Sequence, residues 1–195
     1  MNNGLTNSSV LSLAVSGTNL FAGTYGSGVF LSTNNGTNWT AVNNGLTNTI
    51  VLSLAVSGTN LFAGTYGGGV FRSTNNGTSW TAGNNGLTGT YVLSLAVSGT
   101  NLFAGTCGGV FLSTNNGTSW TAVNNDLTNT WVQSFAVSGT NLFAGTSGRG
   151  VFLSTNNGTS WTAVNNGLTN TWVQSLPSQA RISLPELWRC LFISQ

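Results

Sequence analysis

The chain alternates between short apolar runs and short turn-forming runs along most of its length. In the first copy of this pattern the apolar runs are Val10–Val15, Leu20–Thr24, Val29–Ser32 and Trp39–Val42. Short runs rich in Val, Leu, Phe and Thr, bounded by Gly and Asn, predict strands rather than helices. Because the connections are also short, consecutive strands are expected to form hairpins. The pattern therefore predicts a four-stranded antiparallel meander.

This meander is repeated along the chain. The segment NNGLTN at 2–7 returns, with Asp126 for Gly in one copy, at Asn43, Asn84, Asn124 and Asn165, at intervals of 40 or 41 residues. Four strands in about 41 residues is the spacing of β-propeller blades. A β-solenoid is the alternative, but its coils are usually shorter and need no series of tight hairpins. We predict an all-β propeller with blades at about 8–42, 49–83, 90–123 and 130–164, and a partial fifth at 171–176.

One turn in each copy resembles a known family motif. The stretch STNNGTNW at 32–39 resembles the Asp-box, S-x-D-x-G-x-x-W, of BNR and sialidase-type propellers, with Asn in place of Asp. The four motif positions recur in every copy, at Ser32, Asn34, Gly36, Trp39, Ser73, Asn75, Gly77, Trp80, Ser113, Asn115, Gly117, Trp120, Ser154, Asn156, Gly158 and Trp161. The resemblance implies a turn between the third and fourth strands, away from any ligand. We therefore expect these residues to be structural.

The chemistry of the motif agrees with a structural role. The side chain of Asn34 is expected to accept a backbone N–H two residues on, nearly as well as Asp does. Gly36 is expected to supply a positive φ, and Trp39 to cover its own hairpin with apolar area. Separately, the segment 45–71 resembles the repeats of two-component regulator propellers and of photosystem II assembly-factor-like propellers. Both resemblances imply blades.

Composition excludes several functions. The 195 residues include 4 Arg, no Lys, 1 Asp, 1 Glu and no His, for a net charge of +2. So little positive charge cannot neutralise a nucleic-acid backbone. No apolar run reaches the roughly 18 residues of a spanning helix. A chain this rich in Asn, Thr, Ser and Gly is typical of an extracellular or cell-surface protein, although no signal peptide opens it.

The residue inventory also argues against catalysis. The sialidase resemblance would require an arginine cluster, a tyrosine nucleophile and acidic partners, whereas the repeats carry only Arg72, Arg149 and Asp126. Without His, a Ser–His or Cys–His pair is impossible. Cys107 and Cys190 lack metal-ligand spacing. We predict a non-enzymatic protein with no cofactor and no metal, in which Cys107 is a free thiol.

The copies differ from one another at a few positions that the predicted blade places on one face. These positions precede the first strand or lie in the loop between the second and third strands. Their aromatic and charged members are the candidate ligand-binding residues Tyr25, Tyr66, Tyr91, Trp131, Arg149 and Trp172. Flat apolar rings stack on sugar faces, which favours a carbohydrate, with a protein as the other candidate ligand. The alternative is drift in loops, with the aromatics filling gaps between blades.

The last 19 residues, 177–195, depart from the repeat. Codons can be written for the expected repeat peptide AVSGTNLFAGT that, read one base on, give PSQARISLPEL, the sequence of 177–187. We therefore hypothesise an out-of-frame reading of a fifth blade and a truncated array; the alternative is a true capping tail.

Four blades could close a tight ring, remain an open arc, or self-associate to complete a ring. The sequence favours a non-enzymatic extracellular module for binding or scaffolding. The alternatives are the sensor propeller of a two-component regulator and a fragment of a sialidase-like glycosidase.

Overall fold

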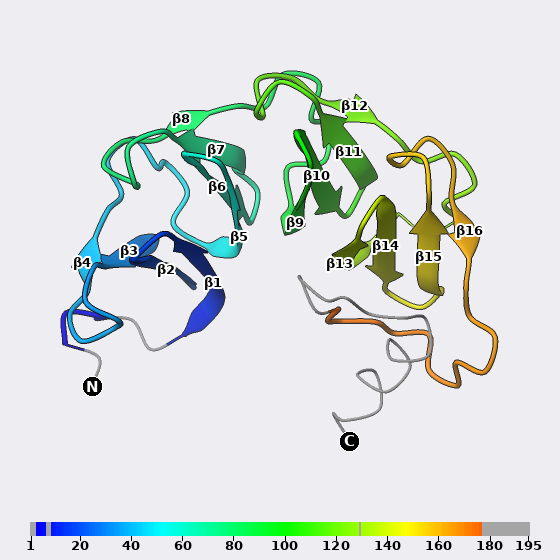
Figure 1. Ribbon diagram of the computed structural model, residues 1–195, viewed down its shortest axis with the longest axis horizontal. Helices are drawn as coiled ribbons and strands as arrows, with labels where there is room; N and C mark the ends of the chain where they lie inside the picture. Colours follow the sequence, from blue (N-terminus) through cyan, green and yellow to red (C-terminus); the bar gives the residue numbers. More distant parts are fainter. Residues whose placement is uncertain (1–2, 7–8, 129, 177–195) are drawn as a thin grey trace.

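The computed structural model describes residues 3–6, 9–128 and 130–176. These residues form four separate four-stranded sheets in which every neighbouring pair of strands is antiparallel (Figure 1). The strands of the first sheet follow one another in chain order: β1 (Val10–Ser16), β2 (Asn19–Thr24), β3 (Val29–Ser32) and β4 (Thr40–Ala41). Each sheet is one blade, so the predicted all-β propeller architecture is confirmed.

The other three blades repeat this order. The second contains β5 (Val51–Ser57), β6 (Asn60–Thr65), β7 (Gly69–Ser73) and β8 (Thr81–Ala82). The third contains β9 (Val92–Ser98), β10 (Asn101–Thr106), β11 (Gly109–Ser113) and β12 (Thr121–Ala122). The fourth contains β13 (Val132–Ser138), β14 (Asn141–Thr146), β15 (Gly150–Ser154) and β16 (Thr162–Ala163). Within the described ranges, no helix is long and apolar enough to cross a membrane.

The outermost strand is shorter than the sequence predicts. We expected it to span Trp39–Val42, but β4 contains only Thr40 and Ala41. The N–H of Trp39 donates instead to the carbonyl of Asn3, at 2.8 Å, so the chain leaves the sheet on that side. The N–H of Val42 still donates to Val29 of β3 at 2.9 Å. The backbone bond before the strand therefore goes to the segment that precedes the first strand of the blade, which limits β4 to two residues.

The blades are arranged as an open arc. The inner strands β1, β5, β9 and β13 lie along its concave side, and the short strands β4, β8, β12 and β16 lie on its outer rim (Figure 1). Consecutive inner strands contact each other from β1 through to β13. The single chain therefore forms an arc rather than a closed four-bladed ring.

The hydrophobic core lies between blades rather than within them. At the first junction, Phe21 and Val29 of the first blade pack with Val51 and Phe71 of the second, and Leu46 joins them from the linker. Equivalent residues form the clusters at the next two junctions. A single blade has two apolar faces and can bury neither alone, so each blade depends on its neighbour.

The fifth repeat begins as the sequence predicts. Val173 and Leu176 are buried against Ala136, Phe143 and Val151 of the fourth blade. They hold the repeat positions of Val10 and Leu13 at the start of the first blade. The hypothesis about 177–195 concerns residues outside the described ranges.

Candidate functional site

The candidate site is built where one blade meets the next, on the face formed by the loops between the second and third strands. In the first blade, the N–H of Tyr25 donates to the carbonyl of Ser9 at 3.0 Å. Tyr25 also forms an antiparallel bridge with Ile50, which enters the inner strand of the second blade. The loop residue therefore lies between the entry points of two consecutive inner strands.

The same arrangement continues along the arc. Tyr66 donates its N–H to Ile50 at 3.0 Å and forms a bridge with Tyr91 of the third blade. In the fourth blade, Ser147 donates to Trp131 at 3.1 Å and forms a bridge with Trp172. Cys107 holds the equivalent position in the third blade. We call this line of residues the variable row; its members are Ser9, Tyr25, Ile50, Tyr66, Tyr91, Cys107, Trp131, Ser147 and Trp172.

The aromatic members of the variable row face solvent. The side chains of Tyr25, Tyr66, Tyr91, Trp131 and Trp172 are between 42% and 64% exposed. The rings of Tyr66 and Tyr91 meet edge to face, with centroids 4.6 Å apart and an interplanar angle of 79°. Such pairs hold each other in a fixed orientation. Each ring keeps a large accessible surface, which a ring that filled a gap between blades would lose.

Arg149, the remaining candidate, lies beside the row in the loop between β14 and β15. Its side chain is exposed, and its carbonyl accepts a hydrogen bond from Nδ2 of Asn165 at 2.9 Å. The structure therefore places all six predicted candidates on one face of the arc.

An asparagine that our sequence analysis did not single out fixes the loop in each blade. Oδ1 of Asn43 accepts the N–H of Val29 at 2.7 Å, and its Nδ2 donates to the carbonyl of Ser27 at 2.9 Å. Gly28 has a φ of +74°, and a Cβ on it would collide with the Asn43 side chain. Only glycine fits both demands. The asparagine therefore holds the loop that carries Tyr25 in one conformation.

We call these asparagines the loop clamps; they are Asn43, Asn84, Asn124 and Asn165. Each accepts the N–H of the valine at the start of the third strand, which is Val29, Val70, Val110 or Val151. The signal in the sequence was the first Asn of the NNGLTN segment, which recurs in every copy. It marks the repeat, but which loop it binds depends on the fold.

The Asp-box-like turns lie at the opposite end of the strands. Their bonding differs in one respect from our prediction, because the N–H two residues after Asn34 does not go to Asn34. That N–H, from Gly36, donates to Ser32 Oγ at 2.9 Å, while Asn34 Oδ1 accepts the N–H of Asn38 at 2.9 Å. The predicted positive φ of Gly36 is present at +80°.

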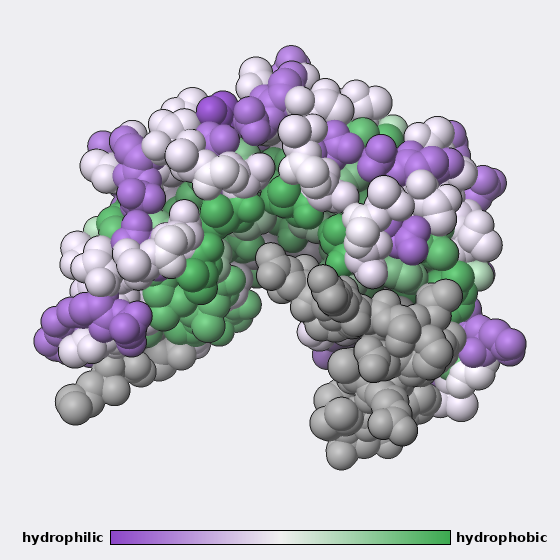
Figure 2. All heavy atoms as spheres, in the orientation of Figure 1, coloured by the Kyte–Doolittle hydropathy of each residue, from purple (hydrophilic) through white to green (hydrophobic). Residues whose placement is uncertain are grey.

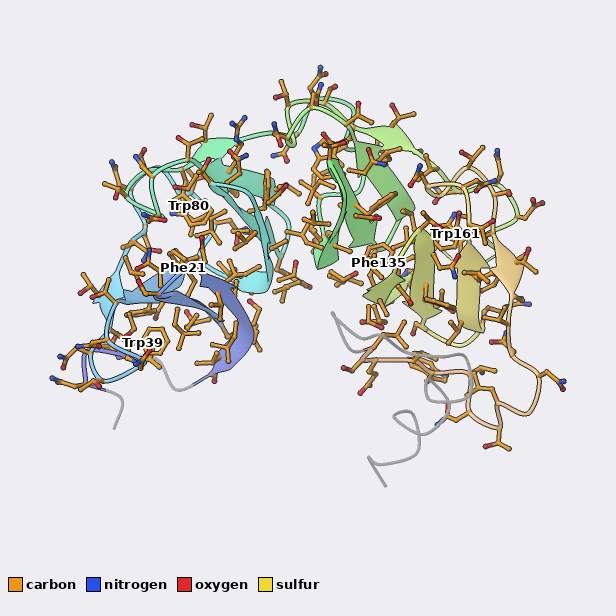
Figure 3. The ribbon with its side chains drawn as sticks, viewed as in Figure 1. Phe21, Trp39, Trp80, Phe135 and Trp161 are labelled. Atoms are coloured by element: carbon orange, nitrogen blue, oxygen red, sulfur yellow. The ribbon has the colours of Figure 1, made fainter. Side chains whose placement is uncertain are left out.

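The tryptophan of each later turn reaches across a junction instead of only covering its own hairpin, as Figure 3 shows for Trp80 and Trp161. The indole Nε1 of Trp80 donates to the carbonyl of Val42 in the preceding blade at 2.8 Å. Trp120 and Trp161 make the equivalent bonds at 2.8 Å. Trp39 instead donates to Gly36 of its own turn at 3.1 Å. These turns therefore join blades.

The described residues offer little reactive chemistry. They contain no group of three or more His, Cys, Asp or Glu side chains that could hold a metal ion. Cys107 forms no disulfide within these residues, and partial burial raises the pKa of its thiol, so the thiol is protonated at neutral pH. The face presents aromatic rings, amides and hydroxyls, which are groups that can bind a ligand non-covalently.

Solved structures with a similar fold come from several kinds of protein. An ancestral GH74 enzyme matches with a TM-score of 0.68 and 24% identity over 84% of this chain and 25% of its own. The extracellular domain of a B. thetaiotaomicron protein described as a putative one-component system matches with a TM-score of 0.72 and 20% identity, over 88% of this chain and 25% of its own. YCF48, bound to a D1 peptide, matches with a TM-score of 0.69 and 14% identity, over 87% of this chain and 59% of its own. This chain thus spans about a quarter of the length of the first two.

No curated protein matches the sequence. The family model of the DUF6242 β-propeller domain matches residues 70–185, which is more than half of the chain. Together with the four-bladed arc and the structural neighbours, this match identifies the chain as a member of the DUF6242 β-propeller domain family.

Proposed function

We propose that this propeller array is a non-enzymatic, extracellular binding module that holds a neutral polysaccharide along the variable row. The observation that carries the proposal is the recurrence of exposed aromatic residues at the same loop positions in all four blades and at the start of the fifth, with bridges across three of the four junctions. A row that crosses several blades fits an extended polymer better than a small molecule, which needs a single concave pocket.

The chemistry of the face favours a neutral sugar chain. Aromatic rings stack on the apolar faces of pyranose rings, and the amides and hydroxyls beside them can bind sugar hydroxyls. Among the described residues of the row and its loops, Arg149 is the charged one. An acidic polymer would need more positive charge than this. The clamps hold the backbone of the loops that carry Tyr25 and Tyr66, so little backbone entropy is lost there on binding.

Binding without hydrolysis is part of the proposal, although one structural neighbour is a GH74 enzyme. Glycoside hydrolysis usually uses two carboxylic acids that flank the scissile bond. The whole sequence holds one Asp and one Glu. Asp126 lies in the linker that follows β12, and Glu186 lies outside the described ranges.

The location and the motif assignment are further parts of the proposal. Several structural neighbours are extracellular domains of B. thetaiotaomicron signalling systems, which supports an extracellular location. The repeated bond from the motif glycine to the motif serine supports assigning the four turns to the Asp-box type, with Asn in place of Asp.

The test is a glycan array followed by affinity electrophoresis in gels containing the polysaccharides that bind. Trp131→Ala and Trp172→Ala should each weaken binding about fivefold or more, because each removes an exposed stacking surface worth roughly 1 kcal/mol or more. The matched control is Thr100→Ala, since Thr100 is exposed in the turn between β9 and β10, on the opposite face. An intact protein that binds no glycan, or variants that bind as well as the control, would refute the proposal.

A sensor propeller is the second candidate, because neighbours include the extracellular domains of one-component and hybrid two-component systems. In that case the same row would bind the signal molecule. Sequencing the gene beyond both ends of this chain tests the idea, since a sensor requires a kinase or regulator segment in the same reading frame.

A further inference from the structure

One end of the arc presents an uncovered apolar face. Leu13 and Val15 of β1 are 60% and 65% exposed, and Figure 2 shows apolar residues gathered at this end and along the concave side. At the three internal junctions the same repeat positions pack against the preceding blade; they are Leu54, Val56, Leu95, Val97, Phe135 and Val137. The junctions therefore show what kind of surface covers this face.

The matching surface lies at the other end of the arc. Ala136, Phe143 and Val151 of the fourth blade hold the repeat positions of Ala14, Phe21 and Val29, which line the first junction. Val173 and Leu176 pack with them in one buried cluster. In the part of the chain that the structure describes, the fourth blade thus meets the beginning of a blade and not a whole one.

The segment that covers the fourth blade is a copy of the segment that opens the first. Residues 165–176, NNGLTNTWVQSL, and residues 2–13, NNGLTNSSVLSL, differ at three positions. Both place Val and Leu in the same spacing, so the first blade of another molecule can occupy the surface that Val173 and Leu176 hold. A whole blade also brings Val15 and Trp39, which the segment 165–176 lacks.

We propose that a second copy of this chain covers the open face, with its fourth blade docked head-to-tail on the first blade and its residues 173–176 displaced. Trp39 supports this docking. Its indole donates to its own turn, whereas the three later tryptophans donate to the end of the preceding blade's last strand. The docked fourth blade would supply the equivalent acceptor, the carbonyl of Val164.

The two copies are expected to form a closed pair. Both ends of the arc flank the same opening (Figure 1), so two molecules can meet at both ends. Head-to-tail contacts give a ring when the rotation closes and a growing filament when it does not. None of the residues named at either face is charged, so no ion loses its hydration on docking.

The test is sedimentation velocity over a range of protein concentrations. The intact chain should show a species of twice its 20.1 kDa mass that increases with concentration. The double variant Leu13→Gln/Val15→Gln should raise the dissociation constant at least tenfold, because two apolar side chains lose their burial. Both residues are exposed in the single chain, so its own fold should be retained.

Two further variants separate this docking from unspecific adhesion. Leu11→Gln makes the same change on the same strand, where other copies carry Gln133 and Gln174, and association should be unchanged. Leu176→Ser loosens the covering segment and should strengthen association. The proposal is wrong if the intact chain is monomeric throughout, if Leu13→Gln/Val15→Gln associates like the intact chain, or if Leu176→Ser weakens association.

Discussion

At the residue scale, two serines of one blade are buried with opposite consequences. Ser53 Oγ lies against Gly64 in the junction and has no hydrogen-bond partner. Ser73 Oγ accepts the N–H of Gly77 at 2.9 Å and bonds to Asn75 at 2.9 Å. An unpaired buried hydroxyl costs free energy, whereas a paired one leaves its partners unsatisfied when it is removed.

The two substitutions Ser53→Ala and Ser73→Ala should therefore change stability in opposite directions. Ser53→Ala should raise the free energy of unfolding by about 1 kcal/mol, and Ser73→Ala should lower it by about 1–2 kcal/mol. Urea unfolding followed by tryptophan fluorescence measures both. A loss of stability in Ser53→Ala would mean that a bound water satisfies its hydroxyl.

Asp126 is the second residue whose local conformation makes a prediction. It has a φ of +65°, and the other copies have glycine at this position, with φ between +79° and +83°. A side chain in this left-handed region is strained, although Asp tolerates it better than most residues. Asp126→Gly should therefore raise the free energy of unfolding by about 0.5–1 kcal/mol.

The reverse substitution provides the control for Asp126. Gly86→Asp places a side chain where a Cβ would collide with the carbonyl of Trp120, so this variant should melt at a lower temperature than the parent. If both variants unfold at the same temperature as the parent protein, the conformation at this position does not limit stability.

At the scale of strands and turns, the tryptophan of each Asp-box-like turn acts as a bond between blades. Trp120 is buried and donates to the carbonyl of Gly83 at 2.8 Å. Trp120→Phe would leave that carbonyl unpaired and remove apolar contact, with an expected loss of about 1–2 kcal/mol in unfolding free energy. Thermal unfolding followed by circular dichroism measures this loss.

Trp39→Phe is the matched control for this bond. Trp39 lies at the end of the first blade, is only partly buried, and donates within its own turn. The loss in Trp39→Phe should therefore be the smaller of the two. Equal losses would contradict the role of the indole bond between blades.

The strands could be predicted because their pattern is local, whereas the bonds between blades could not. Alternation of apolar runs and Gly/Asn turns placed β1, β2 and β3 to within a residue at each end. The short β4, the donation from Trp80 to Val42 and the clamp by Asn43 all depend on partners that the sequence does not identify. For the site, the sequence predicted the shared face, but the contact between Tyr66 and Tyr91 needed the structure.

At the scale of the whole molecule, stability is expected to come mainly from the junctions between blades. The three internal clusters use the same repeat positions, so each complete junction should contribute a similar free energy, as in other repeat proteins. The first blade shares one junction while the second and third share two. Opening should therefore begin at the first blade, unless the proposed second copy covers it.

The near identity of the junctions also means that no blade recognises its own neighbour. Apart from departures such as Arg72 and Gly83, the surface that the first blade offers to the second is the surface that the second offers to the third. These contacts therefore do not determine the order of the blades. The order is determined by the covalent chain, because each short linker holds the next blade close enough to pack before a more distant blade can. A gene in which two blades exchanged places should encode the same arc.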